Sequence, residues 1–156
     1  MKFIEYTVKV FTNGDKEWYL NGKLHREDGP AVEYAEGDKE WYLNGTLHRE
    51  DGPAVENVNG TKAWYLNGTL HREDGPAYES ADGDKFWYLN GKEHRENGPA
   101  YEYVDGTKEY YLDGIKYSEK EFLVKTSVKE PVSCAGKIIK FEGKIYKLEE
   151  VEDKNE

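Results

Sequence analysis

The chain has 156 residues, and its 32 Asp and Glu outnumber its 22 Lys and Arg, which gives a formal net charge of -10. Nucleic-acid backbones and anionic lipid are both bound mainly through Lys and Arg, so this acid balance argues against either partner. Only 37% of the residues are hydrophobic, and the large ones are mostly aromatic: 13 Tyr, 5 Phe and 4 Trp. Such a composition is typical of a thin structure with a shallow core, and it is too aromatic for a disordered chain.

Targeting and disulfide signals are missing from the sequence. The single cysteine, Cys134, excludes an internal disulfide and a Cys-based zinc site. No apolar run approaches the ~18 residues that span a membrane, and the first ten residues alternate and include Glu5, unlike a signal peptide. We therefore expect a cytoplasmic protein that does not contact a membrane.

The chain opens with a segment that predicts a capping strand. Residues 3–11, FIEYTVKVF, alternate apolar and polar side chains. A strand here would cover the open edge of a following sheet. Residues 11–17, FTNGDKE, match the tail of the repeat that follows, so the array begins in the middle of a unit.

Internal repetition dominates the rest of the sequence to residue 117. An aromatic residue opens each unit, and each opening lies 23 residues after the previous one. Four full units begin at Trp18, Trp41, Trp64 and Trp87, and a partial unit begins at Tyr110. A period in this range predicts a stacked array in which each unit buries its apolar face on its neighbours.

Three turn signals occur in each unit. Asn-Gly, first at 21–22, is the dipeptide that a type I′ hairpin turn requires, because both central residues of that turn have positive φ. Glu-Gly at 36–37 and Asp-Gly-Pro at 28–30, with their copies, predict two further turns. Segments of about five residues lie between them, a length typical of strands, and none has the period of a helix.

Side-chain alternation assigns two faces to the strand that opens each unit. In KEWYL at 39–43, Trp41 and Leu43 point to one face, and Glu40 and Tyr42 point to the other. We expect the Trp and Leu face to be covered and the Glu40 column to face solvent. A further column is expected to pack on the tryptophans, and it consists of Val32, Val55, Tyr78 and Tyr101.

The sequence after the array predicts a small C-terminal cap. Ser118 and Glu121 form a capping box, which predicts a short helix over 119–125. Pro131 marks a break, and residues 137–148 predict a hairpin around the Glu-Gly at 142–143. The acidic residues after it are expected to form a solvated tail.

These elements together predict an all-β fold. Residues 1–117 should form an elongated antiparallel sheet or solenoid of 23-residue β-hairpin repeats. Residues 118–156 should form the cap, with its short helix and hairpin.

The units WYLNGKLHREDGPAVEYAEGDKE and their copies resemble the MORN-type repeats (membrane occupation and recognition nexus). They are most similar to the divergent bacterial and bacteriophage branch, in which Asn-Gly and His-Arg-Glu-Asp-Gly-Pro-Ala recur together. The similarity extends over about residues 8–117. It implies an elongated sheet of successive β-hairpins, and a role among scaffolds, antitoxin-like neutralisers and phage proteins.

Two polar columns, one of histidines and one of arginines, recur in every unit and resemble metal-binding or catalytic residues. Neighbouring histidines should lie about 10 Å apart, twice the strand spacing, so they cannot share a zinc ion whose ligands each lie ~2 Å away. We expect each imidazole to bond a turn backbone or a carboxylate of its own unit, and each arginine to bind a carboxylate such as Glu33. The columns are His25, His48, His71 and His94, and Arg26, Arg49, Arg72 and Arg95.

A binding site is expected where the units differ. Aromatic residues are enriched in interface hot spots, although they also pack across strands, and the sequence leaves both roles open. The candidate partner-binding residues are Tyr34, Tyr78, Phe86, Tyr101 and Tyr103.

The sequence thus favours a non-catalytic protein-binding repeat module with no cofactor and no metal. If it is phage-encoded, we expect it to act in the bacterial host cytoplasm on a host factor or a defence system. A small-ligand or nucleotide sequestering protein, an antitoxin-like neutraliser and an acidic mimic of nucleic acid remain as alternatives. An enzyme is not expected, because no nucleophile, Gly-rich phosphate loop or glycosidase cleft accompanies the repeated residues.

Overall fold

The structure is a computed structural model that describes residues 5–127, 138–141 and 144–147. The chain divides into two compact units between Lys116 and Tyr117, and each is described here by itself. Several expectations lie outside the described residues: the start of the predicted strand at 3–4, the break at Pro131, Cys134, the turn at 142–143 and the acidic tail.

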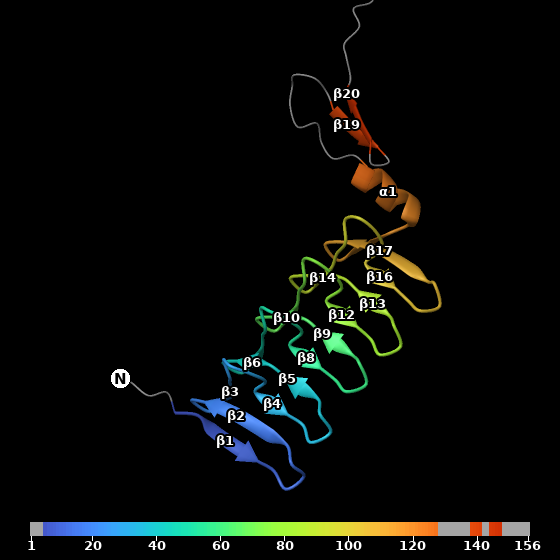
Figure 1. The fold of residues 1–156 in the computed structure, drawn as a ribbon. Coiled ribbons are helices and arrows are strands. Elements are labelled where there is room, and N and C mark those ends of the chain that lie inside the picture. Colours follow the sequence, from blue (N-terminus) through green and yellow to red (C-terminus); the bar gives the residue numbers. More distant parts are fainter. Residues whose placement is uncertain (1–4, 128–137, 142–143, 148–156) are drawn as a thin grey trace, which may run out of the picture. The chain divides into compact units, whose positions relative to one another are not determined.

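The first unit is built on one 12-stranded antiparallel sheet (Figure 1). Its strands follow one another as β1-β2-β4-β5-β8-β9-β12-β13-β16-β17-β18, and β3 pairs with β2. The strands are β1 (Thr7–Val10), β2 (Lys16–Leu20), β3 (Lys23–Leu24), β4 (Val32–Glu33), β5 (Lys39–Glu40), β8 (Val55–Glu56), β9 (Lys62–Ala63), β12 (Tyr78–Glu79), β13 (Lys85–Phe86), β16 (Tyr101–Glu102), β17 (Lys108–Leu112) and β18 (Ile115–Tyr117). The predicted fold class, an all-β array of hairpin repeats, is confirmed.

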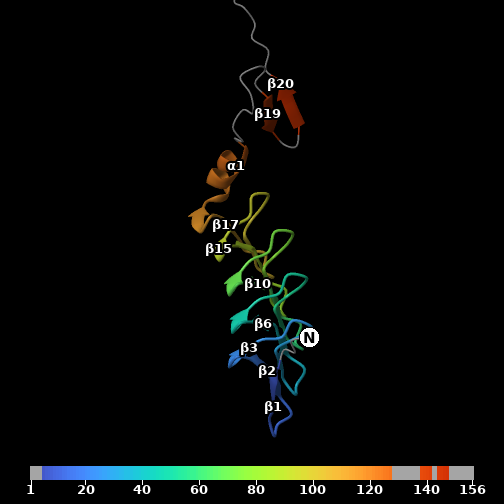
Figure 2. The same ribbon diagram turned by 90° about the vertical axis from the view of Figure 1, so that its left-hand side faces the viewer.

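Each repeat adds two strands to this sheet and one short hairpin beside it. The hairpins are β6 (Tyr42–Leu43) with β7 (Thr46–Leu47), β10 (Tyr65–Leu66) with β11 (Thr69–Leu70), and β14 (Tyr88–Leu89) with β15 (Lys92–Glu93). Figure 2 shows the side strands β3, β6, β10 and β15 following one another in chain order along one side of the array. Most strands are two residues long, shorter than predicted, because the chain leaves the main sheet at Trp41, Trp64 and Trp87 to form the side hairpins.

The Asn-Gly turns have the predicted type I′ conformation. Their first residue has φ between 50° and 54°, and the glycine that follows has φ between 76° and 84°. The partial fifth unit keeps this turn with Asp113-Gly114. At the other end of each unit, Gly14 (φ 97°) and its copies close the second turn with an N–H···O bond to the residue three positions earlier. Both turns that bound the strands are therefore fixed by local residue type.

The most buried positions of the array form a column of alanines. Trp18 donates its N–H to the carbonyl of Ala31, and the N–H of Ala31 bonds to Glu40, the residue before Trp41. Each alanine therefore lies between the aromatic residues that open two successive units. Ala31, Ala54, Ala77 and Ala100 are all 0% exposed. The expectation that the Val32 column packs on the tryptophans is wrong: this alanine column does, because the residue before each Val or Tyr shares the Trp face.

The Glu40 column was expected to face solvent, and this is also wrong. Val32 pairs with Glu17 on one side and Glu40 on the other, and Val55 pairs in the same way with Glu40 and Ala63. Ala63 is buried, and the other members of the column are half-buried. In a sheet of one layer, side chains of adjacent strands cover each other on both faces, so neither face is fully solvated.

The second unit contains helix α1 (Glu119–Ser127) and the hairpin of β19 (Ile138–Phe141) and β20 (Lys144–Lys147). Both were predicted. The capping box is formed, with Ser118 Oγ accepting from the Glu121 N–H at 3.3 Å and Glu121 accepting from the Ser118 N–H at 2.9 Å. Within the helix Phe122 is buried, whereas Leu123 is 54% exposed.

Candidate functional site

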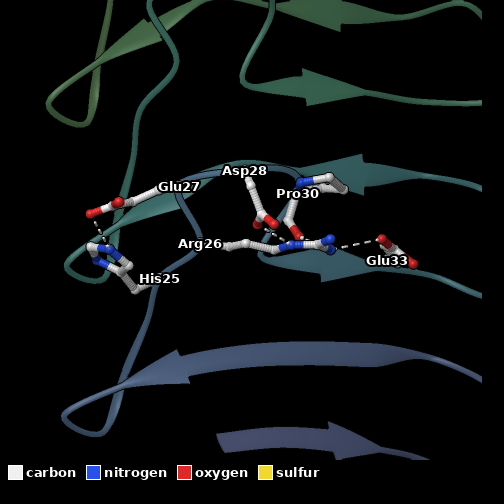
Figure 3. A network of polar contacts seen from close by, with 6 residues as sticks. All are labelled: His25, Arg26, Glu27, Asp28, Pro30 and Glu33. Atoms are coloured by element: carbon white, nitrogen blue, oxygen red, sulfur yellow. Dashed lines mark hydrogen bonds and ion pairs between the residues drawn. The ribbon is translucent and has the colours of Figure 1, made fainter. Parts of the chain in front are cut away.

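A polar network is repeated in every full unit, and Figure 3 shows its first copy. Arg26 lies between three acceptors: its Nε donates to Asp28 at 2.9 Å, and its Nη1 donates to the Pro30 carbonyl at 3.2 Å and to Glu33 at 3.1 Å. The expected contacts between the Arg and Glu columns are thus present, and they recur in the other three units. One arginine therefore ties the Asp-Gly-Pro turn to a strand of the main sheet.

The same arginines cover the tryptophans. The guanidinium carbon lies 3.8–4.2 Å from the ring centre of the Trp in its own unit, a cation–π distance. A Cβ on Gly75 would lie 2.8 Å from Cζ of Arg72, so only glycine lets the guanidinium pack against the turn. The hydrogen bond from each arginine lowers the pKa of the neighbouring aspartate; these are Asp28, Asp51 and Asp74.

The histidines join neighbouring units. Nδ1 of His25 accepts a hydrogen bond from the backbone N–H of Asn44 at 3.0 Å, and His48, His71 and His94 accept in the same way from residues 67, 90 and 113. The sequence predicted a turn backbone or a carboxylate of the same unit. A turn backbone is the partner, but the prediction is wrong about the unit, because that turn belongs to the next unit, 19 residues ahead. The carboxylate of the same unit, Glu27, lies 3.7 Å from Nε2 of His25.

A second contact between units was not anticipated from the sequence. Oδ1 of Asp15 accepts from the N–H of Ala35 at 2.7 Å, and Asp38 accepts from Val58 at 2.8 Å. The later units repeat it, with Thr61 in place of an aspartate. The signal was present, since each copy has Asp or Thr after the turn glycine, and both side chains can accept from a backbone N–H.

A ladder of alternating Lys and Glu crosses the face of the sheet that holds the tryptophans. Lys39 lies directly opposite Glu33 on one side and Glu56 on the other, and the same pairing continues along the array. In order, the ladder is Lys16, Glu33, Lys39, Glu56, Lys62, Glu79, Lys85, Glu102 and Lys108. Opposite charges in directly paired positions stabilise the register of the sheet.

The other face carries a group of aromatic rings in the last units. Phe86 is at its centre, with ring centres 5.6 Å from Tyr78, 4.6 Å from Tyr101 and 5.4 Å from Tyr103. Tyr101 also contacts the rings of Tyr88 and Tyr111 at 5.9 and 5.2 Å. We call these six half-buried residues the aromatic cluster: Tyr78, Phe86, Tyr88, Tyr101, Tyr103 and Tyr111.

The structure separates the five candidate partner-binding residues into two groups. Four of them belong to the aromatic cluster. Tyr34 does not: it occupies the column of Tyr103 in the first full unit, with its side chain 40% exposed. The candidate list lacked Tyr88 and Tyr111, because it was drawn from positions that differ between units, and the tyrosine after the opening aromatic is the same in every unit.

Several tyrosine hydroxyls on this face make hydrogen bonds. Tyr88 and Tyr101 bond to each other, and the Tyr101 hydroxyl also donates to Glu93 at 3.2 Å. In the second unit, Tyr42 donates to Glu40 at 3.0 Å. Burial, followed by these hydrogen bonds, raises the pKa of Tyr42 and Tyr101 above the ordinary value of 10.0.

Among the described residues, no group of three or more His, Cys, Asp or Glu side chains is arranged to hold a metal ion. No helix in that part of the chain has both the length and the apolar character that crossing a membrane requires. A scan against protein-family models found no match, and a search of curated proteins found none.

Proposed function

We propose that the repeat array is a non-catalytic protein-binding module and that its partner binds the aromatic cluster. The single observation that carries this proposal is the contrast between units. Six aromatic rings join on one face in the third and fourth units and the start of the fifth. Three of them, Tyr78, Phe86 and Tyr101, occupy columns that hold Val32, Val55 and Ala63 earlier in the array. Stacking requires none of these aromatic replacements, because the first two units stack without them.

The repeated polar residues support a structural role for the other columns. The histidines accept from the next turn, and the arginines bind the Trp ring, the turn carbonyl and a carboxylate. Each is therefore engaged by neighbours within the array. A half-buried aromatic surface with hydroxyl groups at its edge has the composition found at protein interfaces, where Tyr and other aromatics supply most of the binding energy.

The resemblance to MORN-type repeats points in the same direction, since that family includes scaffolds and neutralising proteins. Action on a host factor or a defence system is a further hypothesis, and it rests on the resemblance to the phage branch alone.

Site-specific cross-linking tests the proposed surface. A benzophenone amino acid replaces Tyr103 in one variant and Tyr34 in a matched control. Tyr34 occupies the same column as Tyr103 but lies outside the aromatic cluster. After irradiation in a lysate of the source cell, we expect one dominant protein adduct at position 103 and none at position 34. Equal adducts at both positions, or none at 103, would contradict the proposal.

A substitution series gives a second test. Phe86→Ala, Tyr101→Val and Tyr103→Asn install the residues that the second unit has at 63, 55 and 57. The triple variant should keep the circular dichroism of the sheet and lose the partner that the unmodified chain captures. Retention of that partner by a folded triple variant would place the interface elsewhere.

A further inference from the structure

The face that holds the tryptophans carries open grooves between successive Asp-Gly-Pro turns. One groove of about 720 Å³ lies between the turns of the first and second units, and another of about 530 Å³ lies between those of the third and fourth. Equivalent residues line both. In the first groove Trp41 and Leu43 provide an apolar surface, and the segments 26–29 and 48–51 form the two sides.

The sides of these grooves are acidic and open to solvent. We call the Glu-Asp pairs at 27–28, 50–51 and 73–74, with Glu96-Asn97 in the fourth unit, the acidic corner. Asp28, Asp51 and Asp74 are 84–86% exposed, and Glu50 and Glu73 are 85% exposed. The arginines beneath are only 22–23% exposed, and each is bound to two carboxylates or, in the fourth unit, to one. A ligand in a groove therefore meets carboxylates and an indole.

We propose that these grooves bind a Lys- or Arg-rich extended segment of a protein, with one basic side chain in each groove. The aliphatic part of a lysine would lie on Trp41 and Leu43, and its ammonium group would lie between carboxylates of two successive corners. The net charge of -10 favours the same partner through long-range attraction. This surface is on the opposite face from the aromatic cluster, so the inference is independent of the proposed function.

The spacing of the units determines the expected sequence of the segment. Each unit adds two strands to the sheet, so equivalent positions between successive turns repeat at about 10 Å, and the two grooves lie two such steps apart. A polyproline II helix rises about 9.3 Å over three residues and returns its side chains to the same side with that period. Basic residues at every third position therefore match the grooves.

Fluorescence anisotropy with a labelled (Lys-Pro-Pro)₄ peptide and the full chain tests the inference. Asp28→Asn, Asp51→Asn and Asp74→Asn are combined in one variant, and each copies the fourth unit, where Asn97 accepts from Arg95 at 3.2 Å. Three lost contacts of the size measured for exposed ion pairs should weaken binding about tenfold. The matched control removes three charges from the second turns by Glu36→Gln, Asp82→Asn and Asp105→Asn, and it should bind within about twofold of the unmodified chain.

Several results would overturn the inference. They are no binding of the peptide, equal loss in the two triple variants, or equal affinity for a peptide in which the four lysines are contiguous. The first two would exclude the grooves as a basic-peptide site, and the third would exclude the spacing. None of them bears on cross-linking at position 103, so failure here and failure of the proposed function are distinguishable.

Discussion

Removing the guanidinium of Arg72 should destabilise the array by about 2 kcal/mol, and a lysine should recover less than half of that loss. The guanidinium lies 4.1 Å over the ring of Trp64 and donates to the Pro76 carbonyl at 3.2 Å. A cation–π contact contributes roughly 0.5–1 kcal/mol, and the carbonyl bond contributes roughly 0.5–1.5 kcal/mol. The ion pair with Asp74, which is 84% exposed, adds only about 0–1 kcal/mol.

Urea unfolding followed by tryptophan fluorescence measures this loss in Arg72→Ala and Arg72→Lys. For a chain of 156 residues, 2 kcal/mol corresponds to a decrease in Tm of about 4–8 °C. The control is Lys85→Arg, an exposed ladder residue on the same face, which should change the free energy of unfolding by less than about 0.5 kcal/mol. Full stability of Arg72→Lys would refute the reasoning, because it would mean that charge alone matters and the planar fork does not.

Three further predictions concern packing, the contacts between units and pH. Ala77→Leu should lower the free energy of unfolding in urea by about 1–3 kcal/mol, because Ala77 is 0% exposed and its backbone carbonyl accepts from the N–H of Trp64; Ala81→Val, which copies Val58, should be nearly neutral. His71→Phe should cost about 1 kcal/mol through the lost bond from Asn90, and His71→Asn should cost less because its Oδ1 can accept in place of Nδ1; equal losses would contradict this. Because the folded pKa of Tyr101 is raised above its ordinary value of 10.0, the unfolded chain loses this proton first, so stability should fall as pH rises above about 10. Absorbance at 295 nm should give a higher tyrosine midpoint for the native than for the denatured chain.

Local features of the fold were predictable because their causes are local. The type I′ turn at Asn21-Gly22 depends only on the φ angles of these two residues. The capping box depends only on Ser118 and on Glu121, three positions later. Both are found as expected, together with helix α1 and the hairpin of β19 and β20.

The assignment of faces failed for a physical reason. The alternation in KEWYL correctly separates Glu40 from Trp41, but it does not say how strongly either side is covered. In a sheet without a second layer, cover comes from the neighbouring strands, so Ala63 on the supposed solvent face is buried and Ala54 on the Trp face is buried too. Alanine gives a weak signal of burial in a sequence, although a column of repeated alanines indicates close packing under larger side chains.

The contacts between units could not be assigned from one unit alone. His25 reaches Asn44 and Asp15 reaches Ala35, at separations of 19 and 20 residues, just under one repeat. Within a single unit each side chain has a plausible local partner, such as Glu27 for His25. The stacking of the units brings the backbone N–H groups of the next unit within hydrogen-bond distance of these side chains. The aromatic cluster was partly predictable, since four of its members differ between units, whereas Tyr88 and Tyr111 do not.

The central claim is that identical side chains join neighbouring units at a strict 23-residue period. Deletion of residues 64–86 joins Ala63 to Trp87 and brings Asn90 to the position from which Asn67 donates to His48. Circular dichroism and urea unfolding of this chain should show a folded β array with a single cooperative transition. A matched deletion of residues 64–85, one residue shorter, should break the register and the transition. If both deletions behave alike, whether folded or unfolded, the account of the array as periodic units joined by these contacts is contradicted.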